Sequence, residues 1–254
     1  MKPPLIENFR SPDEWQTWSE VIDRPVIPDD ERRAMIGLYD GEIHHVDHWI
    51  GNFLQGLEQR RLLDQAVVVL AADHGEEFDD HGGWVHGNTL YEEMIGMPLL
   101  LKLPRGLGAG TRSPLSIDMV DLRSTLTGLA RIDAPSDHGI DYSDEIESLM
   151  ADPPAPIHAY SERPPYLYAL RVGDWKIIRR DRRDSTSWQL YNLRRDPQEL
   201  MDLAESEPET LARLMTELEG AMRSAGNLSW DAADSLPELD PEAERDLRAL
   251  GYIQ

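Results

Sequence analysis

One stretch, from Val67 to Pro104, constrains the fold more than any other part of the sequence. It begins with an apolar run, Val67–Ala72, which predicts a strand buried on both faces. The run ends abruptly in Asp73-His74-Gly75, which would place a carboxylate and an imidazole at the carboxyl end of that strand. In open α/β sheets, ligand sites form at the carboxyl ends of strands. Because Asp and His together make a partial ligand set for a divalent metal, the sequence predicts half of a metal-dependent site here.

The loop after this motif contains two glycine-rich turns and two more histidines, His81 and His86. We expect His81 to hold the loop in place, with contact to a substrate as the alternative. Trp84 would either line a substrate pocket or pack on the loop as an aromatic clamp. The carboxylates between residues 76 and 80 are interpreted as a solvated run near the mouth of the site. A helical turn over residues 89–95 and a second strand over Met97–Leu103 are expected next.

A long helix is predicted before this stretch. Asp29 or Asp30 can cap its first turn, and it should end near Arg60-Arg61. Its apolar residues recur in steps of three and four, which makes one helical stripe: Ile36, Tyr39, Ile43, Val46, Ile50, Phe53 and Leu57. We expect this helix to lie on the sheet and to form, with the strand after it, the αβ part of a crossover unit.

The second half of the chain has a different pattern. A helix is predicted from Asp118 or Asp121 to Leu129, and a proline-containing linker over residues 131–156. Gly173-Asp174 between two apolar runs predicts a hairpin, with a third strand at residues 188–191 and an amphipathic helix from 208 to 222. The predicted organisation is an irregular arm (1–28), an α/β part (29–150), a small α+β subdomain (151–225) and an acidic tail (226–254).

The composition narrows the function classes. With a formal net charge of -23, the chain repels polyanions, and we expect no binding to nucleic acid. The absence of cysteine excludes disulfides, thiolate metal sites and a cysteine nucleophile within these residues. Neither a signal peptide nor a transmembrane segment is visible. As written, the chain is expected to be cytoplasmic, although a longer parent enzyme could be exported, so its compartment stays open.

Taken together, these motifs resemble the sulfatases of the alkaline phosphatase superfamily. The resemblance begins in the helix at residues 38–47 and strengthens at Asp73-His74-Gly75, at His81-Gly and His86-Gly, and at residues 90–93. It continues through the aspartate-led helix at 118–129, the Leu-Tyr-Asn-Leu…Asp-Pro turn at 190–197 and the ending at 247–252. This resemblance implies an incomplete alkaline-phosphatase-like sheet flanked by helices, followed by a small α+β subdomain with an antiparallel sheet and a helix.

The resemblance also implies a reaction and site roles. In that family a formylglycine attacks the sulfate ester, and a metal, usually calcium, neutralises the sulfate oxygens. Asp73 and His74 would be one pair of metal ligands, and His86 the catalytic, sulfate-facing cation; His81 and Trp84 are further candidates for substrate contact. Because members often have Asn at the position of His74 and imidazole is the softer ligand, manganese or zinc remains open beside calcium.

Part of the family's machinery has no counterpart in these residues. The family's other aspartate pair and its Cys/Ser-x-Pro-x-Arg motif, the source of formylglycine, are not found in the sequence. We therefore expect a metal-dependent sulfuric ester hydrolase of which this chain is the C-terminal portion, a fragment inactive without a partner N-terminal half and without a nucleophile of its own. Its substrate would be a small-molecule or saccharide sulfate ester.

Two alternatives remain. Asp-His-Gly motifs recur across the superfamily, so a phosphodiester or phosphonate ester hydrolase, or a phosphoglycerol transferase, is the alternative chemistry. An alternative of another class is a non-catalytic remnant that binds a divalent cation weakly, because two ligands without the family's other carboxylates make a poor site.

Overall fold

The computed structural model describes residues 27–87, 89–113, 115–133, 139–148, 158–163, 167–182 and 185–226. Residues 44–223 form one compact unit, which holds every element discussed below except the outer ends of the first and last helices. The predicted arm (1–28) and acidic tail (226–254) fall almost wholly outside the described residues, and both stay predictions. Among the described helices, none is long and apolar enough to cross a membrane.

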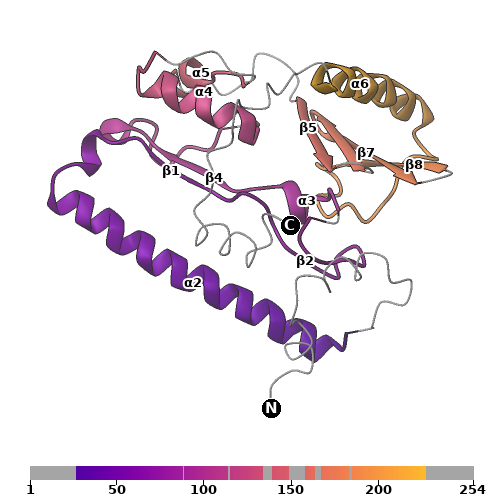
Figure 1. The fold of residues 1–254 in the computed structure, drawn as a ribbon, viewed down its shortest axis with the longest axis horizontal. Coiled ribbons are helices and arrows are strands. Elements are labelled where there is room, and N and C mark those ends of the chain that lie inside the picture. The colour runs from indigo at the N-terminus through magenta and orange to yellow at the C-terminus, as the bar shows by residue number, and fades with distance from the viewer. Residues whose placement is uncertain are drawn as a thin grey trace, which may run out of the picture. The chain divides into compact units, whose positions relative to one another are not determined.

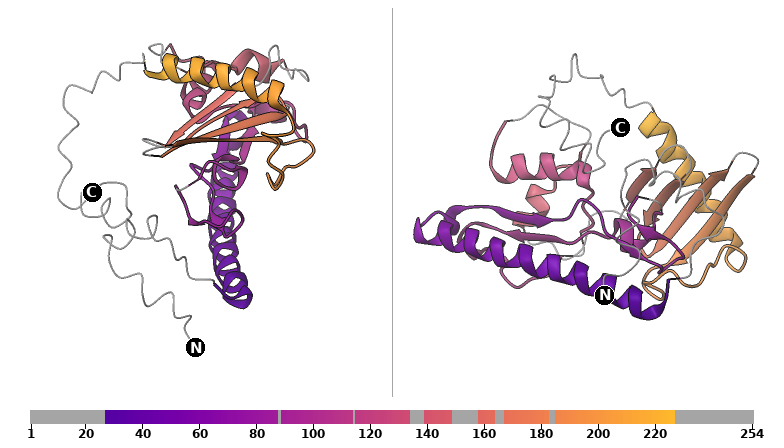
Figure 2. Two further views of the ribbon diagram at one scale, coloured as in Figure 1. Left: turned by 90° about the vertical axis from the view of Figure 1, so that its right-hand side faces the viewer. Right: turned by 60° about the horizontal axis from the view of Figure 1, so that its bottom comes forward.

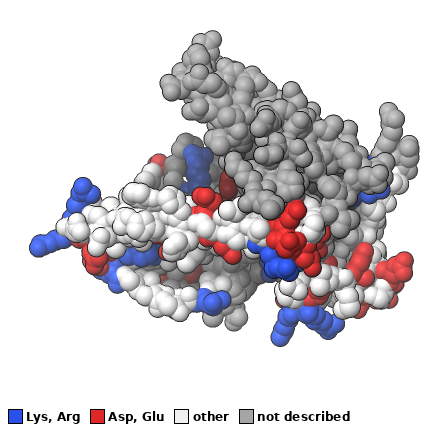
Figure 3. All heavy atoms as spheres, turned by 90° about the horizontal axis from the view of Figure 1, so that it is seen from below, with Lys and Arg blue, Asp and Glu red and all other residues white. Residues whose placement is uncertain are grey.

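The predicted long helix is confirmed as α2, Asp29–Gln59 (Figure 1). Much of its apolar stripe is exposed, however, with 54% of Ile43, 53% of Val46 and 63% of Phe53 accessible to solvent. Figure 3 looks onto this helix from below, where much of its surface is uncharged. No residue of α2 is buried, so the prediction that it packs on the sheet is wrong for the part of the chain that the structure describes.

The two apolar runs that flank the site loop form a narrow ribbon. β1, Val68–Ala71, pairs antiparallel with β4, Leu99–Lys102. Leu70 and Leu100 face each other in this register and are 42% and 56% exposed, so the prediction of a strand buried on both faces is wrong. Length explains the exposure of the helix: four-residue strands are about 13 Å long, whereas α2 is about 46 Å long. In the described residues, such a ribbon cannot cover the helix stripe.

The loop between β1 and β4 contains short elements that hold its shape. β2, Glu77–Phe78, pairs with β3, Trp84–Val85, in a small hairpin that the sequence did not predict. The expected helical turn is confirmed as α3, Glu92–Ile95. Two 3-10 turns, η1 at Leu63–Gln65 and η2 at Pro104–Gly106, flank the ribbon.

The aspartate-led helix is confirmed as α4, Met119–Leu129. Asp118 and Asp121 form a capping box at its start, which satisfies two of the free first-turn amides. The predicted linker contains a short helix that periodicity could not show, α5, Ser143–Glu147. The segment that precedes α5 is bound to α4, because Asp121 of α4 accepts a hydrogen bond from the Ile140 amide at 2.8 Å.

The small α+β subdomain is confirmed as a four-stranded antiparallel sheet and a helix. Its strands follow in sequence order: β5, His158–Arg163; β6, Leu167–Val172; β7, Trp175–Arg182; and β8, Ser185–Asn192. The predicted hairpin joins β6 to β7 through Gly173, whose φ of +60° a side chain would strain. β5 was not predicted. The helix is α6, Pro208–Gly226, and Figure 2 shows it lying along the sheet.

The two faces of this sheet pack on different partners. Leu170, Ile177 and Leu190 pack against Leu214 and Leu218 of α6. On the opposite face, Leu167, Ala169, Ile178 and Tyr191 pack against Leu90 and Tyr91, which directly precede α3. Since side chains alternate along a strand, one sheet thus supports both its own helix and the segment that carries the site.

Lys176 of β7 is the charged centre of that second contact. It is 1% exposed, and its Nζ donates to Glu92 Oε1 of α3 at 2.9 Å. Nζ also lies 2.9 Å from Glu199 Oε1, an ion pair whose angles fall outside those of a hydrogen bond. The other oxygen of Glu199 accepts from the Glu92 amide at 2.6 Å. Burial raises the pKa of Glu199, although the charge of Lys176 opposes the rise.

Replacing Lys176 with Met should therefore destabilise the compact unit strongly. The carboxylates of Glu92 and Glu199 would stay in place without their cation, and breaking a buried pair in this way costs roughly 3–5 kcal/mol in the free energy of unfolding. Urea unfolding followed by circular dichroism measures the loss.

Arg213→Met is the matched control, because it removes an exposed pair with Glu217 on α6, with the atoms 2.6 Å apart. That change should cost less than about 1 kcal/mol. Equal and small losses in the two variants would contradict the central role given to Lys176.

Candidate active site

The residues singled out at the end of the first strand meet in one cavity. The cavity has a volume of about 570 Å³, and Asp73, His74 and His86 all line it. The antiparallel sheet also lines the cavity and contributes Arg171 and Lys176. The structure thus brings together three side chains that the sequence predicted as a site and adds two cations that it did not.

Asp73 and His74 follow β1 directly, and their donor atoms lie close together. His74 Nε2 is 3.8 Å from Asp73 Oδ2, and the two side chains are 39% and 66% exposed. His74 Nδ1 lies 2.8 Å from the Gly75 carbonyl, so Nδ1 is the protonated nitrogen. Nε2 therefore keeps its lone pair on the side of Asp73, as metal ligation requires.

Gly75 fixes where this pair sits. Its amide donates to the Met94 carbonyl at 2.8 Å, which binds the motif to α3. A Cβ at this position would collide with the carbonyl of Glu93, so only glycine allows the approach.

His86 lies against the same pair. Its ring stacks on that of His74, with 4.3 Å between centroids and 25° between planes. Its Nδ1 lies 3.2 Å from Glu76 Oε2, a carboxylate that can orient the ring. Of the acidic run at residues 76–80, Glu76 thus has a defined contact beside the cavity.

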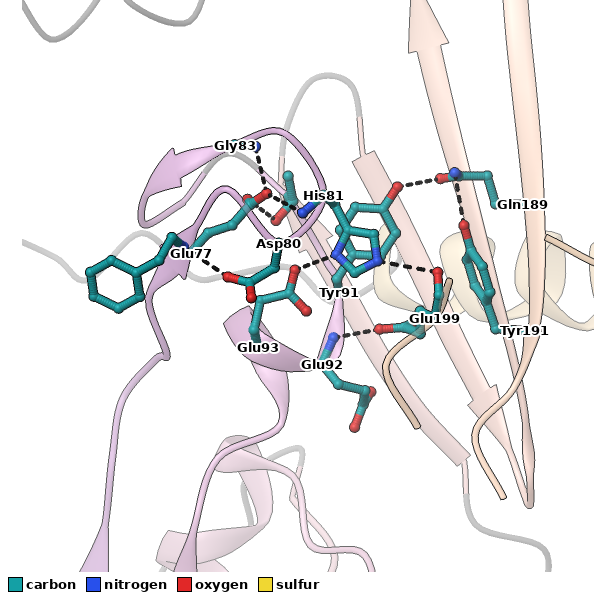
Figure 4. A network of polar contacts seen from close by, with 12 residues as sticks. Glu77, Asp80, His81, Gly83, Tyr91, Glu92, Glu93, Gln189, Tyr191 and Glu199 are labelled. Carbon is teal, nitrogen blue, oxygen red and sulfur yellow. Dashed lines mark hydrogen bonds and ion pairs between the residues drawn. The ribbon is translucent and has the colours of Figure 1, made fainter. Parts of the chain in front are cut away.

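His81 and Trp84 do not line the cavity. Trp84 lies on β3, opposite Phe78 in the hairpin. Figure 4 shows His81 between Glu93 and Glu199, where it joins the loop to the turn after β8. Its ring also stacks on Tyr91 at 3.7 Å. These contacts support the interpretation of His81 as the residue that holds the loop.

Glu77 is the site-loop residue that sequence reasoning missed. It was interpreted as part of a solvated run, yet it is fully buried. Its carboxylate accepts from the amides of Gly83, at 2.7 Å, and His81, at 3.2 Å, and from the Thr89 hydroxyl at 3.0 Å. A side chain at Gly83 would collide with this carboxylate. Gly83 was therefore the local sequence feature that could have indicated a buried Glu77.

Glu77, His81 and Glu93 also resemble a cation site, because their ligand atoms lie within 4.8 Å of one another. The hydrogen bonds argue against that role. His81 Nδ1 is 2.5 Å from the Glu93 carboxylate and Nε2 is 3.1 Å from the Glu199 carbonyl, so both nitrogens face acceptors. A ring that donates on both sides has no lone pair for a metal. The cluster is a hydrogen-bonded support for the loop.

The same contacts set the protonation of His81. Burial lowers its pKa, but the hydrogen bonds to Glu93 and Glu199 and their negative charges outweigh burial and raise the pKa above its ordinary value of 6.5. The folded state thus holds the proton more tightly than the unfolded chain. This stabilisation is complete below pH 6.5 and is lost as the pH rises through the folded pKa.

Replacing His81 with Gln should lower the free energy of unfolding by roughly 1.5–3 kcal/mol at about pH 5.5, because charge-assisted hydrogen bonds are lost. The gap between wild type and variant should narrow as the pH rises through the folded pKa of His81, since the wild-type ring then loses its proton. Urea unfolding at a series of pH values measures this gap.

His48→Gln serves as the control, because His48 is exposed on α2 and contacts Asn52 at 3.0 Å. That change should cost little free energy of unfolding, because the side chain is exposed. A gap for H81Q that stays constant with pH would show that the ring is not held as an imidazolium.

The chain is similar to known proteins in sequence and in structure. The sulfatase family model matches residues 7–132, and the model of the N-sulphoglucosamine sulphohydrolase C-terminal region matches residues 80–225. An N-acetylglucosamine-6-O-sulfatase of Bacteroides thetaiotaomicron is 30% identical over 168 residues, which cover 62% of this chain and 30% of that protein. The chain spans about a third of the length of the curated relatives it matches.

Solved structures show the same fold. A protein in complex with its substrate D-glucosamine-2-N,6-O-disulfate superposes with a TM-score of 0.63 and 26% identity, covering 76% of this chain and 41% of that one. A phosphonate monoester hydrolase of Agrobacterium radiobacter gives 0.62 and 20%, covering 83% and 45%. The order of motifs, the fold and the match of a family model to more than half of the sequence agree, and the chain belongs to the sulfatase family of the alkaline phosphatase superfamily.

Proposed function

We propose that this chain supplies the metal-binding and sulfate-binding part of a site that hydrolyses sulfate esters. The observation that carries the proposal is the cavity in which Asp73, His74 and His86 meet. Asp73 and His74 would bind the divalent cation, and His86 would contact the sulfate group.

The donor chemistry of the first pair fits a cation. A carboxylate oxygen and an imidazole lone pair 3.8 Å apart can bind one ion between them. The family's usual metal is calcium, which prefers oxygen, and the imidazole of His74 keeps manganese or zinc as alternatives. When bound, the metal would supply positive charge to neutralise the sulfate oxygens. The tautomer of His74, fixed by the Gly75 carbonyl, already presents the required nitrogen.

His86 has the position and orientation for the second role. Because Glu76 accepts from Nδ1, Nε2 is the atom that can meet a sulfate oxygen or the leaving oxygen of the ester. The stack on His74 fixes the plane of the ring. An imidazolium there can donate a hydrogen bond to the anion or a proton to the leaving group.

The nucleophile would have to come from a segment outside these 254 residues. The sequence contains no cysteine and no Ser-x-Pro-x-Arg motif, so the precursor of formylglycine is not among them. We infer that these residues bind metal and sulfate but carry out no turnover without a partner segment that holds the nucleophile.

Sulfated saccharides are the substrate class that the similar proteins favour. One relative is named as an N-acetylglucosamine-6-O-sulfatase, and one solved structure contains D-glucosamine-2-N,6-O-disulfate. The alternative, hydrolysis of a phosphonate or phosphodiester, is supported by the shared fold with a phosphonate monoester hydrolase at 20% identity. It ranks second because the sequence relatives are sulfatases.

Replacing Asp73 with Asn should weaken calcium binding at least about tenfold, because a neutral amide replaces the one carboxylate of the pair. Isothermal titration calorimetry of the full chain measures the dissociation constant.

Asp79→Asn is the matched control, since Asp79 lies on the same loop, does not line the cavity and already has the positive φ that Asn tolerates. It should leave calcium binding within about twofold of wild type. Calcium binding that resists D73N but falls with D79N would place the metal elsewhere on the loop.

The chain alone, assayed with an aryl sulfate and calcium, should show no turnover above a heat-denatured sample. Clear turnover that D73N abolishes would disprove the need for an outside nucleophile while keeping the metal site.

A further inference from the structure

The antiparallel sheet contributes more to the cavity than support. Along β6, Leu167, Ala169 and Arg171 alternate onto the face that packs toward the site segment. Ala169 and Arg171 both line the cavity, and so does Lys176, which is paired with Arg171 across β6 and β7. This face is apolar around Ala169 and Ile178 and becomes cationic at Arg171, where it meets the cavity.

Lys176 and Arg171 differ in how many N–H donors remain for a ligand. Lys176 is 1% exposed and lies between two carboxylates at 2.9 Å each. Arg171 is 34% exposed, and its Nε donates to the Gly173 carbonyl at 3.2 Å. Its Nη1 lies 3.9 Å from Glu92 Oε2, beyond hydrogen-bond distance. Since a guanidinium has five N–H donors, most of those on Arg171 are available to a ligand in the cavity.

Glu92 forms a long ion pair with Arg171, at 3.9 Å, and the acidic residues of the cavity also have other partners or roles. Asp73 belongs to the proposed metal site. Glu92 is held by Lys176 at 2.9 Å, and the Asp118 side chain accepts from the first turn of α4 in the capping box. An anionic group beside Arg171 would thus meet a cation rather than an unpaired carboxylate.

We propose that Arg171 is a specificity residue that binds a second anionic group of the substrate. It would form a bidentate pair with a carboxylate or a second sulfate, the geometry that a guanidinium favours. The substrate class is thereby narrowed to saccharide sulfate esters that carry a further oxoanion beside the ester to be cleaved. This inference rests on the proposed function, in which the first sulfate is bound by the metal and His86.

The test compares ligands with one and two anionic groups. The probes are N-acetylglucosamine 6-sulfate, glucosamine N,6-disulfate and a monosulfated disaccharide that carries a uronic acid. Each is titrated calorimetrically into the full chain with calcium present. Wild type should bind at least one doubly charged probe about tenfold more tightly than the singly charged one.

Arg171→Gln should remove that preference, weakening the favoured doubly charged probe about tenfold and the singly charged probe less than about twofold. Arg171→Lys should restore only part of the affinity, because an ammonium lacks the bidentate fork. Arg180→Gln is the matched control: Arg180 pairs with Leu167 on the same sheet but does not line the cavity, and its loss should change neither affinity.

The outcomes separate the two levels of inference. If a doubly charged probe binds more weakly to R171Q but not to R180Q, the assignment of Arg171 is supported. The probe that loses more affinity shows whether Arg171 binds a carboxylate or a sulfate. If all probes bind wild type and R171Q equally, with unchanged circular dichroism, the assignment is overturned while the sulfate site stands. If no probe binds wild type, the proposed function fails and the assignment fails with it.

Discussion

The candidate site depends on one buried cation. Lys176 holds Glu92, which begins α3, and the amide of Glu92 in turn binds Glu199 in the turn after β8. The carbonyl of Met94 in α3 accepts a hydrogen bond from the amide of Gly75, the residue next to the proposed ligand His74. A continuous chain of polar contacts thus runs from the antiparallel sheet to the end of β1. Because buried charges are tolerated only when paired, each of these contacts fixes the position of the next residue in the chain of contacts.

Residues of the same type have different roles because their partners differ. His81 and His86 are five positions apart on one loop. Both nitrogens of His81 face acceptors within the protein, whereas His86 lines the cavity and has a polar contact through Nδ1. Lys176 and Arg171 are paired across two strands, and the lysine is enclosed by carboxylates while the arginine keeps free donors. Side chains whose donors are all paired within the protein shape the cavity. Side chains that keep free donors, His86 and Arg171, can bind a ligand.

Local pattern was enough to predict much of this fold. Apolar periodicity located α2 and α6, a capping aspartate located α4, and Gly173 located the hairpin of β6 and β7. The motifs around Asp73, His74 and His86 were sufficient to predict three side chains that share a cavity. The exposure of Leu70 and of the α2 stripe was missed, because burial depends on which elements pack together rather than on the composition of a run.

Long-range packing also hid parts of the site. Glu77 reads as one of several loop acids, and only the fold reveals that Gly83 and Thr89 surround its carboxylate. Arg171 lies in a strand more than eighty residues from His86, and nothing local marks it as a cavity residue. Arg171 reaches the cavity because Leu90 and Tyr91 pack on the face of β6 that also carries Ala169. Local sequence periodicity cannot predict such a long-range contact.

The central claim is that Asp73, His74 and His86 act on one ligand, a sulfate bound next to a metal. Titration of inorganic sulfate into the chain with labelled histidines, with and without calcium, tests it directly by nuclear magnetic resonance. We expect sulfate to shift the ring signals of His86 and His74 only when calcium is present. Equal shifts without calcium, or shifts confined to the exposed His45 and His48 of α2, would contradict the claim.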